Sequence, residues 1–111
     1  MVQAIQKVAT IASSGSLSGA VDLDLNRMLA IQMPSAWTAA DLTFQGSLDG
    51  STFYDLYDEN DAEVTVQAAA SRFIILEPAR LLGIPHVKVR SGTAASPVAQ
   101  GAERTIILVA M

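Results

Sequence analysis

The chain of 111 residues has no cysteine and a single histidine, and only 16% of its residues are charged. Without cysteine the fold can use neither disulfides nor thiolate metal ligands, so the chain is indifferent to its redox compartment. Ordinary globular proteins carry roughly a quarter charged residues, so little charge is available here to cover the surface of a small domain. We therefore expect other subunits or partners to cover part of that surface. A monomer with a surface of Ala, Ser and Thr is the alternative.

The sequence also has no long hydrophobic run and no cluster of basic residues. No segment approaches the roughly 18 consecutive apolar residues of a membrane span. The N-terminal residues 1–19 contain one lysine and no uninterrupted apolar stretch, unlike a secretory signal. The net charge is −4, and the carboxylates cluster between residues 55 and 63, where they would repel a phosphate backbone. We expect a soluble protein that binds neither a membrane nor nucleic acid directly.

Half of the residues are apolar, and their arrangement is most informative between residues 42 and 58. Apolar and polar residues alternate on both sides of Asp49-Gly50, a dipeptide suited to the type I′ turn of a two-residue hairpin loop. The register predicted by this turn pairs Leu42 with Tyr57, Phe44 with Asp55, Gly46 with Phe53, and Leu48 with Ser51. The pattern predicts a β-hairpin with one apolar face, on which Phe53 covers Gly46.

Further segments have the alternation or the β-branched composition of strands. They are residues 3–12, 20–25, 28–33, 63–66, 72–76, 86–90 and 104–111. No segment has helical periodicity, and turn residues separate the strands. We therefore predict one all-β domain over residues 1–111, a β-sandwich of jelly-roll type with about eight short antiparallel strands. An immunoglobulin-like strand order is the alternative.

Several local expectations follow from these strands. The last six residues are all apolar, so the final strand should be central in a sheet or pressed against a neighbouring subunit. Within residues 86–90, the valines should point inward and Arg90 outward. Trp37, shortly after a proline, is expected to plug the core or the end of the sandwich rather than to stack on a ligand. Residues 1–19 and 91–102 are a possible N-terminal arm and an arm-like loop.

Few side chains could support catalysis. His86 follows a proline on the expected outer side of a strand, and no serine has the G-x-S-x-G setting of a nucleophile. Asp58, Asn60 and Asp61 offer oxygen ligands, but the EF-hand pattern fails at Ala62 and at its missing glycine. We expect a solvated tip there, with a looser calcium site in residues 55–63 left open. The chain is predicted to be a non-enzyme without catalytic, cofactor-binding or metal-binding residues.

The segment SLDGSTFYDLYDENDAEVTV, followed by RFIILEPARLLGIPHVKVRSG, resembles a pattern found in small tailed-phage virion proteins and in discoidin-like galactose-binding jelly rolls. The resemblance covers about residues 37–92, and its elements are the S-x-D-G-x-x-F hairpin starting at Ser47 and the strand end at 86–92. The phage resemblance implies a capsid decoration, or cement, protein that bridges capsomers, is homo-oligomeric and often trimeric, and contacts a major capsid or other virion protein. Its location would be the virion, assembled in the host cytoplasm.

Two other functions stay open beside this one. A head-fibre, neck or tail accessory protein fits the same composition, and a carbohydrate-binding module could use Tyr54, the aromatic side chain least needed for packing. No binding residue can be transferred from the resemblance. The expected contact elements are the segment before Gly19, the loop 91–102 and the C-terminal strand, because these have the least local reason to be ordered alone.

Overall fold

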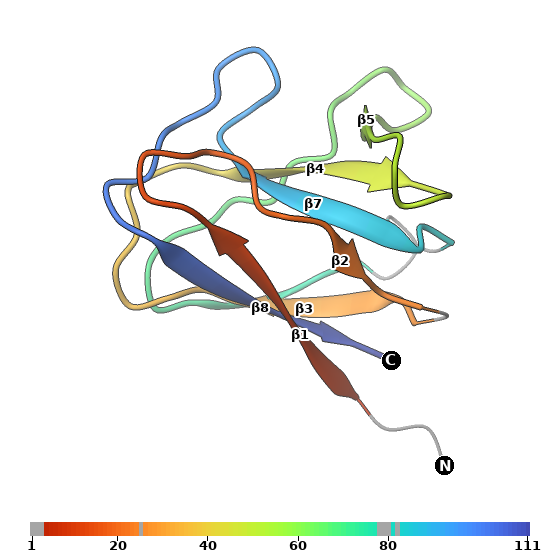
Figure 1. Cartoon of the computed structure of the whole chain (residues 1–111), viewed down its shortest axis with the longest axis horizontal. Helices are drawn as coiled ribbons and strands as arrows, with labels where there is room; N and C mark the ends of the chain where they lie inside the picture. Colours follow the sequence, from red (N-terminus) through yellow and green to blue (C-terminus); the bar gives the residue numbers. More distant parts are fainter. Residues whose placement is uncertain (1–3, 25, 78–80, 82) are drawn as a thin grey trace.

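The computed structural model describes residues 4–24, 26–77, 81 and 83–111. These residues form eight antiparallel strands in two four-stranded sheets and no α-helix (Figure 1). The strands are β1 Ile5–Ile11, β2 Val21–Asp22, β3 Met28–Gln32, β4 Leu42–Ser47, β5 Tyr54–Asp55, β6 Phe73–Ile75, β7 His86–Ser91 and β8 Arg104–Ala110. The predicted all-β class is confirmed.

The strand order is β1-β8-β3-β6 in one sheet and β2-β7-β4-β5 in the other. The first and last strands of the chain pair along seven residues, from Ile5 opposite Ala110 to Ile11 opposite Arg104. Strand β8 lies between β1 and β3, which makes the apolar C-terminal strand central in its sheet, the first of the two expected positions (Figure 1). Its side chains alternate between a fully buried set that includes Leu108 and an outer set, in which Ile107 and Val109 are half-buried and Thr105 is exposed.

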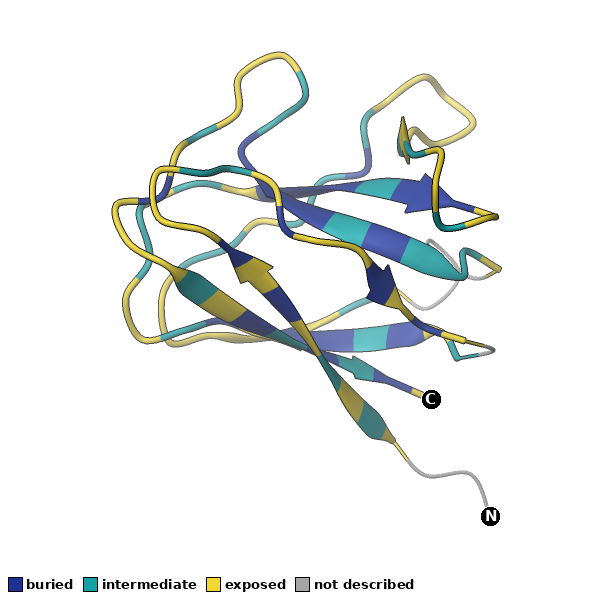
Figure 2. Ribbon diagram, viewed as in Figure 1, coloured by how far each residue is buried: buried dark blue, intermediate teal, exposed yellow. Residues whose placement is uncertain are grey.

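One apolar core lies between the two sheets. Both sheets contribute to it, and the largest fully buried apolar side chains are Phe44, Ile11, Leu23, Met28, Ile31, Leu42, Ile106 and Leu108. Burial of each such side chain contributes about 1.5–3 kcal/mol of transfer free energy. Figure 2 shows the resulting alternation of buried and exposed residues along β1. Trp37 packs half-buried against this core, as expected, and its indole Nε1 donates to the carbonyl of Ala40 at 3.0 Å.

The predicted hairpin forms, but its turn and its register are wrong. Strands β4 and β5 pair with Gln45 opposite Asp55 and Gly46 opposite Tyr54, one residue away from the predicted register. Gly50 has a φ of 79°, whereas Asp49 has no positive φ, so the type I′ turn is absent. The connection is a wider loop, because the Asp49 side chain organises it instead of serving as a turn residue.

The Asp49 carboxylate accepts hydrogen bonds from the backbone N–H groups of Ser51 and Thr52 at 2.8 and 2.9 Å. The Ser47 hydroxyl accepts from the N–H groups of Asp49 and Gly50. Together these bonds satisfy the backbone donors of the loop. The one-residue shift also moves Phe53 away from Gly46.

Leu56 and Ile84 cover Gly46 instead of Phe53. A Cβ atom at Gly46 would come within 2.8 Å of Leu56 Cδ2 and 2.9 Å of Ile84 Cγ2. The glycine is therefore required by the close packing of two aliphatic side chains.

The two candidate arms differ in their structure. Of residues 1–19, residues 5–11 form β1, and residues 1–3 lie outside the described part of the chain. The loop after β7 projects from the end of the sheets but is fixed at its base (Figure 1). There the N–H of Val98 donates to the carbonyl of Ser91, and buried Gln100 donates to the Ser91 hydroxyl at 2.7 Å. The segment 63–66 makes only isolated bridges, such as Leu42 with Val66.

Candidate binding face

Among the described residues, the side chains on one broad sheet face carry no charge. In the β1-β8-β3-β6 sheet, the register turns one set of side chains away from the core. This set, which we call the uncharged face, consists of Gln6, Val8, Thr10, Ala30, Gln32, Phe73, Ile75, Thr105, Ile107 and Val109. Lys7 belongs to the opposite side, because its register partner is the fully buried Leu108.

The uncharged face is arranged in rows that cross all four strands. In one row Val8 lies opposite Ile107, which lies opposite Gln32, which lies opposite Phe73. The next row runs from Gln6 through Val109 and Ala30 to Ile75. Apolar groups therefore adjoin one another across the strands instead of being scattered.

Its large side chains are open to solvent at both edges. The exposed fractions are 55% for Val8, 57% for Phe73 and 80% for Ile75. A solvated face of an antiparallel sheet ordinarily carries polar and charged side chains. The exposed apolar side chains make this face a candidate binding surface.

The outer face of the other sheet is charged and is covered by the chain itself. Arg90 points away from the core, as expected, but other parts of the chain cover it, and it is only 6% exposed. Its Nη1 and Nη2 donate to Asp55 Oδ1 at 2.8 and 2.9 Å, and Nη2 also donates to Glu63 Oε2 at 3.3 Å. Its Nε donates to the Thr43 hydroxyl at 3.0 Å. This guanidinium holds the segment 55–63 against the sheet.

Two further contacts complete this cover. The Lys88 Nζ lies 4.5 Å from the centroid of the Phe53 ring, a cation–π geometry. The Glu63 carboxylate also accepts from the N–H of Ala94 at 3.1 Å, which ties the loop after β7 to the same cluster. The outer face of this sheet is therefore built for internal packing, in contrast to the uncharged face.

The Asp58 side chain bonds to the backbone of its own turn. Asp58 Oδ1 accepts from the N–H groups of Asn60 and Ala62 at 2.8 and 3.0 Å, closing a local turn. Within the described residues, no group of three or more His, Cys, Asp or Glu side chains is placed to hold a metal ion. His86 is half-buried beside Gly50, with its Nδ1 4.0 Å from Asp22 Oδ1.

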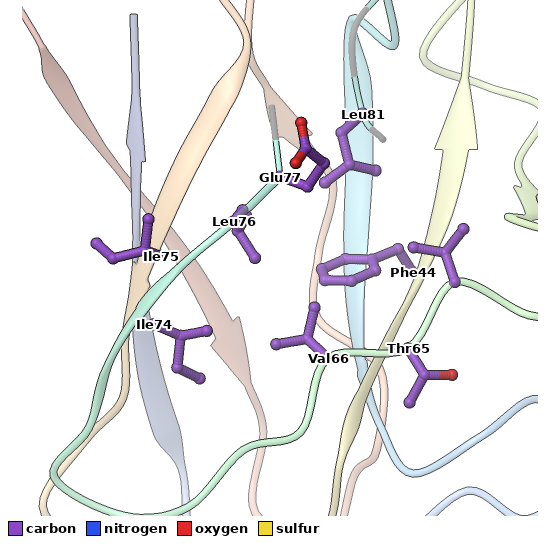
Figure 3. Close-up of a pocket in the computed structure, with 9 residues that line it drawn as sticks. Phe44, Thr65, Val66, Ile74, Ile75, Leu76, Glu77 and Leu81 are labelled. Carbon is purple, nitrogen blue, oxygen red and sulfur yellow. The ribbon is translucent and has the colours of Figure 1, made fainter. Parts of the chain in front are cut away.

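Two hollows accompany these faces. A pocket of about 380 Å³ opens between the sheets, where Phe44 and Val66 face Ile74 and Leu76 across the gap (Figure 3). Its described lining is apolar apart from Thr65 and from Glu77 at one end, so it can receive an apolar group but lacks paired catalytic side chains.

The second hollow, of about 510 Å³, lies beside the exposed Tyr54, the residue considered for carbohydrate binding. It is floored by Gly46 and Leu56 and bordered by Leu48 and Asp49. Tyr54 is 71% exposed, so its ring is available to a ligand.

Sequence reasoning missed the uncharged face because it combines four segments that are far apart in the chain. The only signal lay in every second residue of the segments 5–11 and 104–110. None of these outward residues is charged: Gln6, Val8, Thr10, Thr105, Ile107 and Val109. Strand order is required to see that these positions join.

Comparison with known proteins does not assign the chain to a family: no family model, curated protein or solved structure matches it. The described residues also contain no helix that is long and apolar enough to cross a membrane.

Proposed function

We propose that the chain is a non-catalytic binding domain built as a jelly-roll sandwich. The strand order supports this fold, because each early strand pairs with the matching late one: β1 with β8, β2 with β7, β3 with β6, and β4 with β5. This is the pairing of one long hairpin wrapped into two sheets, the arrangement of jelly rolls in viral capsid and lectin domains.

Within this class, the proposed protein is a structural component of a phage particle, a capsid decoration or cement protein that bridges capsomers in the virion. The observation that carries the proposal is the uncharged face, with Val8, Phe73 and Ile75 exposed on a four-stranded sheet. Bridging capsomers needs a rigid scaffold and a surface that buries apolar area, and it needs no catalytic group. The partner is a major capsid protein or another virion protein with an uncharged docking surface.

The size of the face implies that several copies act together. Four strands spaced about 4.8 Å apart, with about five residues each, give a sheet face of roughly 300 Å². A stable interface buries about 800 Å² on each partner. One domain therefore binds weakly, and a homo-oligomer that presents several faces gains affinity through multivalency.

Co-sedimentation with particles tests this function. Heads and tails purified from the phage that encodes the chain are centrifuged with wild-type protein and with two folded variants. Val8→Asp places a carboxylate on the uncharged face, and the control Leu48→Asp places one on an 82% exposed residue of the loop after β4. We expect the wild type and the control to sediment with heads, and Val8→Asp to bind at least about tenfold more weakly, because its carboxylate would be buried without a partner.

Three outcomes would contradict the proposal. They are no sedimentation of the wild type with either particle, equal binding of Val8→Asp, and loss of binding in Leu48→Asp alone. Sedimentation with tails and not heads would favour the head-fibre, neck or tail accessory function over the decoration function.

A carbohydrate-binding module is the second candidate, supported by the hollow beside Tyr54. An exposed aromatic ring next to the Asp49 carboxylate and the Ser47 hydroxyl has the elements of a sugar site, an apolar platform beside hydrogen-bonding groups. A glycan array distinguishes the two candidates. Sugar binding that is lost in Tyr54→Ala and retained in Val8→Asp would favour the module.

A further inference from the structure

The hollow beside Tyr54 has an apolar floor that is fixed by close packing. Its volume of about 510 Å³ lies within the roughly 300–1,000 Å³ of small-ligand sites. A Cβ at Gly46 would come within 2.8 Å of Leu56 and 2.9 Å of Ile84, so these two side chains lie directly against the strand. The exposed side chains of Leu48 and Tyr54 also line the hollow. It therefore offers apolar contact to a ligand from several directions.

Asp49 is the one charged side chain among the described residues that line this hollow. A single carboxylate oxygen, Oδ1, accepts the hydrogen bonds from the N–H groups of Ser51 and Thr52 and from the Ser47 hydroxyl. Within the described part of the chain, no hydrogen bond or ion pair reaches Oδ2. The bonds from Thr52, Ser51 and Ser47 lower the pKa of Asp49 to about 2, so the carboxylate is ionised at neutral pH. One anionic oxygen is thus open to a ligand.

The other polar side chains of the lining offer few hydrogen-bond donors. Ser47 is buried, and its hydroxyl is fully engaged, since it donates to Asp49 and accepts from two backbone N–H groups. Among the described lining side chains, this leaves the hydroxyls of Thr52 and Tyr54. An ionised carboxylate accepts hydrogen bonds and donates none, so the lining attracts a cation and repels an anion. The exposed Tyr54 ring adds the attraction of its π face for a cation.

We propose that this hollow binds an organic ammonium ion, with its charge beside Asp49 and the Tyr54 ring and its apolar body against Leu56 and Ile84. The inference goes beyond the proposed docking function, because the hollow shares no residue with the uncharged face. It also differs from a site for neutral sugars, whose hydroxyls need donors as well as acceptors around them. The ligand class is fixed by the unmatched carboxylate together with the exposed aromatic ring.

An NMR titration of the isotope-labelled chain with choline tests the site. The matched probe is dimethylbutanol, the neutral isostere of choline in which a carbon atom replaces the quaternary nitrogen. We expect choline to shift the amide signals of Leu48, Thr52 and Tyr54 with a dissociation constant of about 1–10 mM. Dimethylbutanol should bind about fivefold more weakly, because it has the same shape but no charge for the carboxylate and the ring.

Two variants and their controls locate the charge recognition. Asp49→Asn keeps a side-chain oxygen for the N–H groups of the loop but removes the charge, so it should weaken choline binding about fivefold and leave dimethylbutanol binding unchanged. Glu103→Gln changes the net charge by the same amount in the loop between β7 and β8 and should not affect choline binding.

The aromatic ring is tested separately, at an exposed position where substitution should not unfold the domain. Tyr54→Leu keeps an apolar side chain but removes the ring, and it should weaken choline binding about threefold. The control Tyr54→Phe keeps the ring and should retain choline binding. Recovery by phenylalanine distinguishes a role of the π face from a role of the hydroxyl.

Several outcomes would overturn the inference. They are equal binding of choline and dimethylbutanol, choline binding that is unchanged in either Asp49→Asn or Tyr54→Leu, and the absence of any shift at about 50 mM choline. D-Glucose that binds at the same amides more tightly than choline would also overturn it and would favour the carbohydrate-binding module. D-Glucosamine that binds more tightly than D-glucose would support it, with a sugar as the carrier of the ammonium group.

These outcomes are separate from the test of the proposed function. Asp49→Asn leaves every residue of the uncharged face in place, so it should sediment with phage heads like the wild type. Loss of the choline site with retained particle binding would remove this inference alone. A choline site in a chain that binds no particle would remove the proposed function alone.

Discussion

Replacement of Arg90 by methionine should strongly destabilise the fold, because the residue crosslinks three parts of the chain. Its side chain is 8% exposed, while those of Asp55 and Glu63 are 35% and 15% exposed. Arg90→Met keeps the apolar bulk but leaves both carboxylates without their cation. Removal of one partner of a buried ion pair costs about 3–5 kcal/mol, and partial hydration of Asp55 places the expected loss near the lower value, at about 3 kcal/mol. A domain of this size is stable by only about 5–15 kcal/mol.

Urea unfolding followed by the fluorescence of Trp37, the only tryptophan, measures this loss. Lys88→Met is the matched control from the same strand. Its cation–π contact is worth about 1 kcal/mol or less. Adding Asp55→Asn and Glu63→Gln to Arg90→Met should recover part of the loss, because the remaining groups are then neutral. An Arg90→Met protein within about 0.5 kcal/mol of the wild type would refute the crosslinking role.

Three further predictions concern the loops and the C-terminal strand. Hydrogen bonds from the backbone N–H groups of Thr52 and Ser51, and from the Ser47 hydroxyl, lower the pKa of Asp49 from 3.8 to about 2. The contribution of the Asp49 carboxylate to folding stability should therefore be complete above about pH 4 and disappear as the pH falls through about 2. An NMR titration of the Asp49 carboxyl carbon with a midpoint near 4 would contradict this. Gly92→Ala should lower the free energy of unfolding in urea by about 2 kcal/mol or more, because Gly92 has a φ of 88° and a Cβ there would lie 2.5 Å from a backbone oxygen. The control Gly19→Ala should be nearly neutral, because nothing lies within 4 Å of a Cβ at that position. Deletion of residues 106–111 removes the strand between β1 and β3 and should abolish the cooperative unfolding transition, and a deletion protein with wild-type circular dichroism would show that β8 is dispensable.

The strands were predictable because their patterns are local. Alternation places the buried side chains of β1, β7 and β8 correctly. The composition of the C-terminal segment predicted a strand that is either central or covered by another subunit, and the strand order shows that it is central. The hairpin shows where local chemistry becomes insufficient. Asp49-Gly50 marks the turn, but the hydrogen bonds of the Asp49 side chain widen the loop and shift the register by one residue.

The candidate site could not be predicted in the same way. Arg90 alternates with buried valines, and this pattern indicates only that its side chain points outward. Its burial depends on carboxylates 27 and 35 positions away in the chain. The uncharged face depends on which strands become neighbours, and this follows from the wrapping of the whole chain. Charge scarcity alone indicated that some surface would be covered, without saying which.

The most direct test of the central claim is hydroxyl-radical footprinting of the chain on phage particles. If the uncharged face docks, labelling of Val8, Phe73 and Ile75 should fall on particle binding. The exposed Leu48, in the loop after β4, and the exposed Tyr54, on β5, should remain labelled. Protection of Leu48 and Tyr54 with Val8 still labelled would contradict the account.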